Sequence, residues 1–505
     1  RQPFLTQTAS PRLRSSTALP FPSASSAFMI SGYPRGSLES LHNESMPSDA
    51  MKLPDGPAWK VLWALAWPAV LLNSLQTINS LLDVNFIQHL PPSALTAVGA
   101  GTPVIFLFGS LTFMLGTAST ALVARFYGAQ DRPSLMEASQ KTLSLAVYFG
   151  VILAALAIPS SQLFAPMLLP PNSADAAKDM GIYLGIFSLS LPAMNLIQCL
   201  AGSLRGIGDT KSPMVLSGIQ IALHIFLNWM LIFDSHEVVG MTIPCAGWGL
   251  AGAAASLTIS AWIAALGYLW WASKTPLQLK FTFVPPGLEW TWRITKIAVP
   301  SGVLSIVRVT SLMAFTAILA HTPEGSHAIA AMRVGFSIES IAFMPAFGLA
   351  IAASALVGQS LGMKDPNRAS HLGWVAGHHA AVVSAVVSLG LFLFALPITS
   401  ALLPQQPEVA KIASHYIMFI AATEIFFAYG MVMVGGMQGA GDTLTPLLLT
   451  IISMWLIRVP LAAFLVLGMR MGSDGCWLAM SATQLVQGIL AMVLFGMGRW
   501  KKVEI

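Results

Sequence analysis

Two segments that each occur twice decide the fold. Ala121-Leu-Val-Ala-Arg-Phe-Tyr-Gly-Ala-Gln-Asp131 returns as Ala355-Leu-Val-Gly-Gln-Ser-Leu-Gly-Met-Lys-Asp365, at an offset of 234 residues. Further along, Gly206-Ile-Gly-Asp-Thr210 returns as Gly439-Ala-Gly-Asp-Thr443, at an offset of 233. Landmarks that recur in order at a nearly constant offset indicate an internal repeat. The chain is therefore expected to consist of two homologous halves.

The composition places both halves in a membrane. Charged residues make up 9% of the 505 residues and hydrophobic residues 55%, and the mean hydropathy is +0.70. Soluble domains contain about 25% charged residues. A charge at the centre of a bilayer costs roughly 2.5–3.5 kcal/mol even on the most lenient scale, so membrane spans contain few ions. The sparse charges thus predict a polytopic membrane protein.

The hydropathy pattern predicts twelve spanning helices. They lie near 60–86, 93–124, 138–158, 180–204, 213–233, 247–272, 292–320, 328–357, 371–397, 412–437, 444–468 and 475–498. If both ends of the chain are cytoplasmic, the inner segments from residue 51 onward carry sixteen Lys and Arg residues. The outer segments carry three, Lys178, Lys411 and Arg470. This bias follows the positive-inside rule. It supports the number of spans, because one span more or fewer would place basic loops on both sides of the membrane.

Six spans per repeat is an even number, so both repeats insert with the same orientation. We therefore expect an all-α fold of two pseudo-symmetric six-helix lobes, related by an axis along the membrane normal, with a central cavity between them. The expected boundaries are 56–272 for the first lobe, 273–291 for a cytoplasmic linker, 292–498 for the second lobe and 499–505 for a cytoplasmic end.

Residues 1–55 differ from the rest. They are rich in Ser and Pro, contain no acid before Glu39, and do not begin with Met. Two interpretations stay open: a transit-type presequence, or a mis-assigned start with Met29, Met46 or Met51 as the true one. Either way the segment is expected to be disordered. We expect a bacterial inner membrane, with a plastid envelope as the alternative.

The repeated Gly-x-Gly-Asp-Thr segments predict tight inner turns in which Asp and Thr cap the next helix. The residues concerned are Gly206, Gly208, Asp209, Gly439, Gly441 and Asp442. A phosphate-binding loop is disfavoured, because no Lys-Ser or Lys-Thr pair follows in Walker spacing and no strand precedes.

The outer part of the first helix carries a polar stripe. Gln76, Asn79 and Asp83 stand at i, i+3 and i+7, so they share one face. Polar groups in lipid face a partner or a watery cavity. Desolvation raises the pKa of a carboxyl group, and a bound cation lowers it. One buried acid can thus exchange a proton or Na⁺ for substrate, so Asp83 is our first choice for a coupling site. The alternatives are a structural aspartate and an interfacial one near the headgroups.

These landmarks resemble the multidrug and toxic compound extrusion (MATE) family, in family order over about residues 58–498. The matching points are Pro68, Leu82-Asp83, Ala94-Leu-Thr-Ala-Val98, Gly128-Ala-Gln-Asp131, Leu204-Arg-Gly-Ile-Gly-Asp-Thr210, Leu356-Val-Gly-Gln-Ser-Leu-Gly362 and Gly439-Ala-Gly-Asp-Thr443. The resemblance, nearest to prokaryotic NorM- and DinF-like members, implies two lobes forming a V. It also implies alternating access and export of organic, often cationic or amphiphilic, compounds against Na⁺ or H⁺ entry.

The resemblance also implies positions for further site residues. On the fifth helix, the Asn-x-x-x-Asp of the DinF-like branch corresponds to His224 and Asn228, which share a face at i, i+4. This departure puts that branch's cation site in doubt. The predicted cation-coupling residues are Asp83 and Asn79 of the first helix together with His224 and Asn228. The unperturbed pKa of a histidine is about 6.5, so His224 is a candidate proton carrier. The alternative is a packed, hydrogen-bonded histidine.

In the second half, Arg308 stands where NorM-like members carry a glutamate eight residues after the proline of the seventh helix. Arg308 is predicted to line the substrate cavity together with Gln76 and Glu424. Glu424 lies on the tenth helix, about one turn from the usual position of an acid there. Two interpretations stay open for Glu424. It forms an ion pair with Arg308 or Arg458, as buried membrane charges usually do, or it contacts substrate or cation.

Metal and disulfide chemistry are disfavoured. His371, His378 and His379 share a face of the ninth helix, but no carboxylate or cysteine lies nearby at ligand spacing. Of the three cysteines, Cys199, Cys245 and Cys476, only the last two fall on the same predicted side, and unpaired thiols are favoured over a bridge.

The leading hypothesis is a cation-coupled multidrug exporter that acts as a monomer without a cofactor. H⁺ is favoured over Na⁺, because His224 is titratable and the NorM-type acid of the seventh helix is absent. No ATP motif supports a primary pump, and the net charge of +5 fits basic cytoplasmic loops rather than nucleic-acid binding. The alternatives are a lipid-linked saccharide flippase, a membrane-embedded enzyme, for which no nucleophile–base pair is found, and a non-transporting scaffold.

Overall fold

The computed structural model describes residues 56–169, 173–238, 241–280 and 284–505. Nearly all of them are helical, as predicted, because a helix satisfies its backbone hydrogen bonds within its own segment when lipid surrounds it. The tail expected at residues 1–55 lies outside the described residues.

The first repeat, which we call half 1, contains seven helices and a short hairpin. The helices are α2 (Ala58–Ile87), α3 (Pro92–Gly128), α4 (Arg132–Leu168), α5 (Ala174–Ser188), α6 (Leu191–Gly206), α7 (Lys211–Ile232) and α8 (Gly249–Ser273). Strands β1 (Ser235–Val238) and β2 (Met241–Pro244) pair antiparallel between α7 and α8. The all-α prediction missed this hairpin, which joins two helix ends.

The second repeat, half 2, contains the remaining elements. They are α9 (Leu288–Ala320), α10 (Gly325–Gly362), α11 (Pro366–Leu393), α12 (Ala395–Leu402), α13 (Pro407–Ala421), α14 (Glu424–Gly439), α15 (Leu444–Thr450), η3 (Ile451–Arg458), α16 (Val459–Ala463), η4 (Phe464–Gly468), α17 (Ser473–Met497) and η5 (Arg499–Lys502). Elements α15 to η4 form one continuous span.

The described residues contain ten helices that are long and apolar enough to span a membrane, and twelve spans if two bent pairs count as one each. This confirms the predicted fold class. The expected spans near 180–204 and 412–437 each consist of two helices that meet at an angle. Helices α5 and α6 meet at 41°, and α13 and α14 at 58°. Pro192, at the start of α6, explains the first break, because proline has no N–H for a continuing helix.

The span from 444 to 468 is also irregular. Its segments η3 and η4 are π-helical, and they flank Pro460 in the first turn of α16. A proline removes one backbone donor, and a π-helical turn is a common way for a helix to absorb such a defect.

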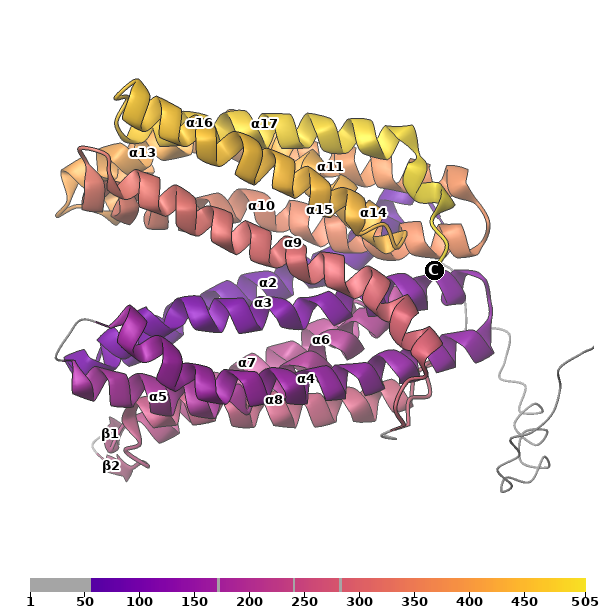
Figure 1. Ribbon diagram of the computed structural model, residues 1–505, viewed down its shortest axis with the longest axis horizontal. Coiled ribbons are helices and arrows are strands. Elements are labelled where there is room, and N and C mark those ends of the chain that lie inside the picture. Colours follow the sequence, from indigo (N-terminus) through magenta and orange to yellow (C-terminus); the bar gives the residue numbers. More distant parts are fainter. Residues whose placement is uncertain (1–55, 170–172, 239–240, 281–283) are drawn as a thin grey trace, which may run out of the picture. The chain divides into compact units, whose positions relative to one another are not determined.

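Each half packs against the other through its first two helices. Helix α2 of half 1 packs against α10 of half 2, and α9 of half 2 packs against α3 of half 1. Figure 1 shows α9 running between the two sets of helices. A buried cluster joins Leu62 and Ala66 of α2 to Ala346 and Leu349 of α10. The same pairing thus occurs twice, once from each repeat.

The repeated segment around residues 121–131 and 355–365 lies at this junction. Gly128, near the end of α3, faces the backbone of Gln359 on α10, and a Cβ at this glycine would collide with it. Its repeat counterpart Gly362 faces the backbone of Arg125 in the same way. Gln359 also donates a 2.8 Å hydrogen bond to the carbonyl of Gly206. The glycines allow the backbones of the two halves to touch.

The two Gly-x-Gly-Asp-Thr segments form the turns before α7 and α15. Gly208 and Gly441 have φ values of +87° and +89°, a region that favours glycine. The Asp209 carboxylate accepts a 2.9 Å hydrogen bond from the backbone N–H of Ser212, and Asp442 accepts one of 3.0 Å from Thr445. Each aspartate thereby satisfies a free donor at the start of the next helix.

Candidate functional site

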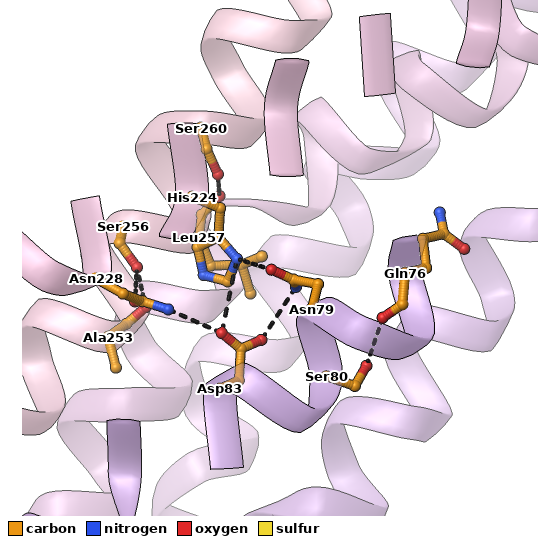
Figure 2. A network of polar contacts seen from close by, with 10 residues as sticks. All are labelled: Gln76, Asn79, Ser80, Asp83, His224, Asn228, Ala253, Ser256, Leu257 and Ser260. Atoms are coloured by element: carbon orange, nitrogen blue, oxygen red, sulfur yellow. Dashed lines mark hydrogen bonds and ion pairs between the residues drawn. The ribbon is translucent and has the colours of Figure 1, made fainter. Parts of the chain in front are cut away.

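The polar stripe of α2 contains one carboxylate. The amide of Asn79 donates a 3.2 Å hydrogen bond to Oδ2 of Asp83, one helical turn further on. Gln76, which shares this face, is exposed and points away from the carboxylate (Figure 2). The stripe therefore divides into a hydrogen-bonded part around Asp83 and a free amide at Gln76.

Helix α7 supplies the second side of the site. Asn228 donates a 2.8 Å hydrogen bond to Oδ1 of Asp83, so each carboxylate oxygen accepts one amide N–H. The Nδ1 atom of His224 lies 3.3 Å from Oδ1 of Asn79 and 3.8 Å from Oδ1 of Asp83. Figure 2 shows the side chains of Asn79, His224 and Asn228 gathered around the Asp83 carboxylate. The structure thus brings together the four residues that the sequence analysis proposed for cation coupling.

Helix α8 fixes the orientation of Asn228. The hydroxyl of Ser256 donates a hydrogen bond to Oδ1 of Asn228 and also one to the carbonyl of Ala253. With its oxygen engaged by Ser256, the Asn228 amide turns its N–H towards Asp83 (Figure 2). Sequence analysis missed Ser256, because a lone serine in an apolar helix carries no signal of its partner.

Burial differs within the cluster. His224 and Asn228 are 5% and 2% exposed, whereas the side chain of Asp83 keeps 28% of its surface. Among the described residues no Lys or Arg pairs with Asp83. A carboxylate held only by neutral amides and a histidine still lacks a compensating charge. The site can therefore accept a cation from the exposed side.

Half 2 contains a second acidic cluster. Glu339 on α10 accepts hydrogen bonds from the hydroxyl of Tyr416 on α13 and, at 3.4 Å, from the amide of Gln484 on α17. Glu424, at the start of α14, is 1% exposed, and neither of its carboxylate oxygens has a hydrogen-bond partner. Both acids line one small enclosed space with Tyr416 and Ser388.

The predicted ion pair of Glu424 with Arg308 or Arg458 was wrong. Arg458 donates from Nε to the hydroxyl of Thr483 at 2.9 Å, and its charge acts on Glu339 rather than forming a contact with Glu424. Arg308 is exposed. Glu424 therefore has no basic partner among the described residues.

Two residues of this cluster, Tyr416 and Gln484, escaped sequence reasoning. They are 77 and 145 residues away from Glu339. No local spacing connects them. The intramembrane acid itself was the one available signal, since such a residue is expected to have a partner.

The histidines of α11 have ordinary roles. Nδ1 of His378 and of His379 lies within hydrogen-bonding distance of the backbone carbonyls of Trp374 and Val375, one turn earlier. No group of three metal-ligating side chains occurs in the part of the chain that the structure describes. Cys199, Cys245 and Cys476 are free thiols.

Comparisons with known proteins bear on the whole chain. The family model described as MatE matches twice, over residues 68–230 and 300–464, once in each half. The probable multidrug resistance protein NorM of Thermotoga maritima is 28% identical over 88% of this chain and 93% of its own length. The multidrug resistance protein PmpM of Pseudomonas aeruginosa is 26% identical over 79% of this chain and 82% of its own.

Solved structures agree on the fold. The crystal structure of MATE in complex with MaL6 superposes with a TM-score of 0.81 at 20% identity, covering 89% of this chain and 98% of that one. A MOP superfamily transporter from Pyrococcus furiosus superposes with a TM-score of 0.82 at 20% identity, covering 91% and 100%.

Proposed function

The chain belongs to the MatE family of multidrug efflux transporters, and from this premise we propose that it exports organic compounds in exchange for a cation bound at Asp83. It is a multi-pass membrane transporter and not an enzyme. The observation that carries the proposal is the setting of Asp83. Both oxygens accept amide hydrogen bonds, no Lys or Arg among the described residues neutralises the charge, and part of the side chain is exposed.

Such a carboxylate couples two fluxes when cation and substrate use it in alternation. A ligand shifts a conformational equilibrium only through different affinities for the two states. Binding of a cation to Asp83 removes the charge that attracts an organic cation, and loss of the cation restores it. By linkage each ligand lowers the affinity for the other, which is the requirement for exchange.

The ligand set favours H⁺ over Na⁺. Hard metal cations need several oxygen ligands, about six to eight in the case of Ca²⁺. Around Asp83 the Asn228 oxygen already accepts from Ser256, and the amides present N–H groups to the carboxylate. A proton needs one oxygen only, and His224 stands 3.8 Å away as a second titratable group. We propose H⁺ coupling in a bacterial inner membrane, with both ends of the chain cytoplasmic and the protein monomeric.

The test is drug-driven cation flux in proteoliposomes. Purified protein is reconstituted with a pH-sensitive dye inside, and a cationic drug is added under a proton or a sodium gradient. The Asp83→Asn variant is expected to lose coupled flux by at least about 100-fold, because an amide cannot take up the cation. Asp175→Asn, an exposed acid in the first turn of α5, is the matched control and should retain flux. Unchanged coupled flux in Asp83→Asn would remove the site assignment.

A further inference from the structure

The two repeats differ in charge at one matched position. Pro68 and Pro300 are 232 residues apart, and the same offset relates Gln76 to Arg308. Asp83 corresponds at this offset to Phe315, which is buried. Half 1 therefore has the neutral Gln76 and the acidic Asp83 at these two positions, whereas half 2 has the basic Arg308 and the apolar Phe315. The charge on this face of the helix is negative in half 1 and positive in half 2.

Arg308 faces the helices of half 2. Leu304, Ser311 and Phe315 are three of the buried residues of α9. Arg308 stands four residues after Leu304 and three residues before Ser311. That spacing places all four on one face. Ser311 donates a 3.4 Å hydrogen bond to the carbonyl of Met454 in η3, so this face looks towards η3. Arg308 itself is exposed, so neighbouring side chains do not cover it.

No acid neutralises Arg308 within the described residues. It makes neither an ion pair nor a hydrogen bond there, and the charge of Arg458, on which it acts, has the same sign. Glu339 is engaged by Tyr416 and Gln484. A charged side chain in a membrane span normally has a partner. The missing partner of Arg308 should therefore be a ligand.

Depth decides between two sources of an anionic partner. Arg308 stands twelve residues before the end of α9 at Ala320. At 1.5 Å per residue this is about 18 Å from the helix end, well inside a hydrocarbon core of about 30 Å. Lipid phosphates lie outside that core. The acidic group of a transported molecule can reach this depth, because transport takes it through the protein.

We propose that Arg308 is an anion-recognition site for substrate, and that the favoured substrates are amphiphiles bearing a carboxylate in addition to a cationic group. The guanidinium forms two parallel hydrogen bonds with a carboxylate, which gives orientation as well as affinity. The inference rests on the proposed function, since it needs a transported substrate. It adds that half 2 selects for the acid, while the Asp83 site in half 1 attracts the cation.

A matched pair of dyes tests this site. Rhodamine 123 is the methyl ester of rhodamine 110, so the two differ in the free carboxylate and share the cationic ring system. Dissociation constants are measured by fluorescence polarisation on the purified full chain in detergent. Arg308→Gln, which installs the residue found at the matched position of half 1, is compared with Arg333→Gln, an exposed arginine of α10.

The native chain and Arg333→Gln should bind rhodamine 110 about tenfold more tightly than rhodamine 123, as expected for one charge-assisted bidentate contact. Arg308→Gln should reduce this ratio to within about twofold while the affinity for rhodamine 123 stays unchanged. Arg308→Lys should keep part of the preference, because lysine keeps the positive charge but lacks the paired N–H donors of the guanidinium.

An unchanged dye ratio in Arg308→Gln overturns the proposal, and so does an equal loss of affinity for both dyes. Proton-driven export of rhodamine 123 by the native chain in proteoliposomes is measured in parallel. If that export occurs and the dye preference is absent, the proposed function stands and the Arg308 site fails. If neither dye is bound or exported, the proposed function itself has failed.

Discussion

Asp83 in half 1 and Glu424 in half 2 are both acids within membrane helices, but their surroundings differ. Each oxygen of Asp83 accepts an amide hydrogen bond, and 28% of the side chain stays exposed. Glu424 is 1% exposed, and neither oxygen has a partner. Exchange of a cation needs both access and donors that stabilise the free carboxylate. Half 1 meets both requirements, and half 2 meets neither at Glu424.

The acids of half 2 have a structural role in this comparison. Glu339 ties α10 to α13 and α17 through Tyr416 and Gln484, and Arg458 acts on it from η3. Four elements of half 2 thus meet at one carboxylate. In half 1 the corresponding network around Asp83 joins α2, α7 and α8. The network around Glu339 is closed, whereas the network around Asp83 is open to a ligand. We call them the closed and the open network.

The largest effect should follow removal of Glu339. Glu339→Leu leaves the Tyr416 hydroxyl and the Gln484 amide buried without their acceptor and removes the acid whose charge offsets that of Arg458, which should lower the free energy of unfolding by about 3–5 kcal/mol. Asp83→Leu should lower it by about 1 kcal/mol or less, because Asp83 is partly exposed and its partners are neutral amides. Urea unfolding in mild detergent measures both. Equal losses for the two variants would break the comparison.

Replacement of Glu424, in contrast to replacement of Glu339, should not lower the free energy of unfolding. Glu424→Met keeps the size of the side chain and removes two buried oxygens without partners, so the free energy of unfolding should stay equal or rise by about 1–3 kcal/mol. Coupled drug flux should remain within about threefold of native, well below the change expected for an exchange site. Thermal unfolding and the proteoliposome assay measure the two effects. Loss of flux in Glu424→Met would show that both halves exchange cations.

The sequence predicted the open network better than the closed one. Gln76, Asn79 and Asp83 repeat along one helix, and His224 and Asn228 follow at i, i+4 on another, so each stripe was visible locally. The two polar faces were expected to meet, because polar side chains in a membrane span avoid lipid. The twelve spans followed equally directly from apolar runs and basic loops.

The closed network depended on contacts without local spacing. Tyr416 and Gln484 lie on other helices, 77 and 145 residues from Glu339, and neither has a charge that would call for a partner. The assumption that opposite charges pair then led to the wrong partners for Glu424. The bend of 58° between α13 and α14, which begins at Glu424, was also hidden, because no proline stands at that break.

A smaller effect tests how α7 holds the carboxylate. Asn228→Leu removes the 2.8 Å hydrogen bond to Asp83, so the cation concentration for half-maximal drug efflux should shift about tenfold, the equivalent of about 1.4 kcal/mol for a bond to a charged group. Asn195→Leu is the matched control. Asn195 is a buried asparagine of α6 that donates to its own helix, at Leu191. A shift of equal size in the control would indicate a general packing effect.

The smallest expected effect concerns Ser256, which touches the site through another residue. Ser256→Ala removes the donor that fixes the Asn228 amide and leaves its N–H free to turn from Asp83. We expect a shift of about two- to fourfold in the half-maximal cation concentration, as for the loss of one neutral hydrogen bond of about 0.5–1 kcal/mol. Ser260→Ala is the control one turn along α8, where the hydroxyl bonds only the carbonyl of Leu257 (Figure 2). The double variant Asn228→Leu with Ser256→Ala should shift no further than Asn228→Leu alone, because the serine acts only through that amide. An additive shift would mean that Ser256 reaches the carboxylate by another route.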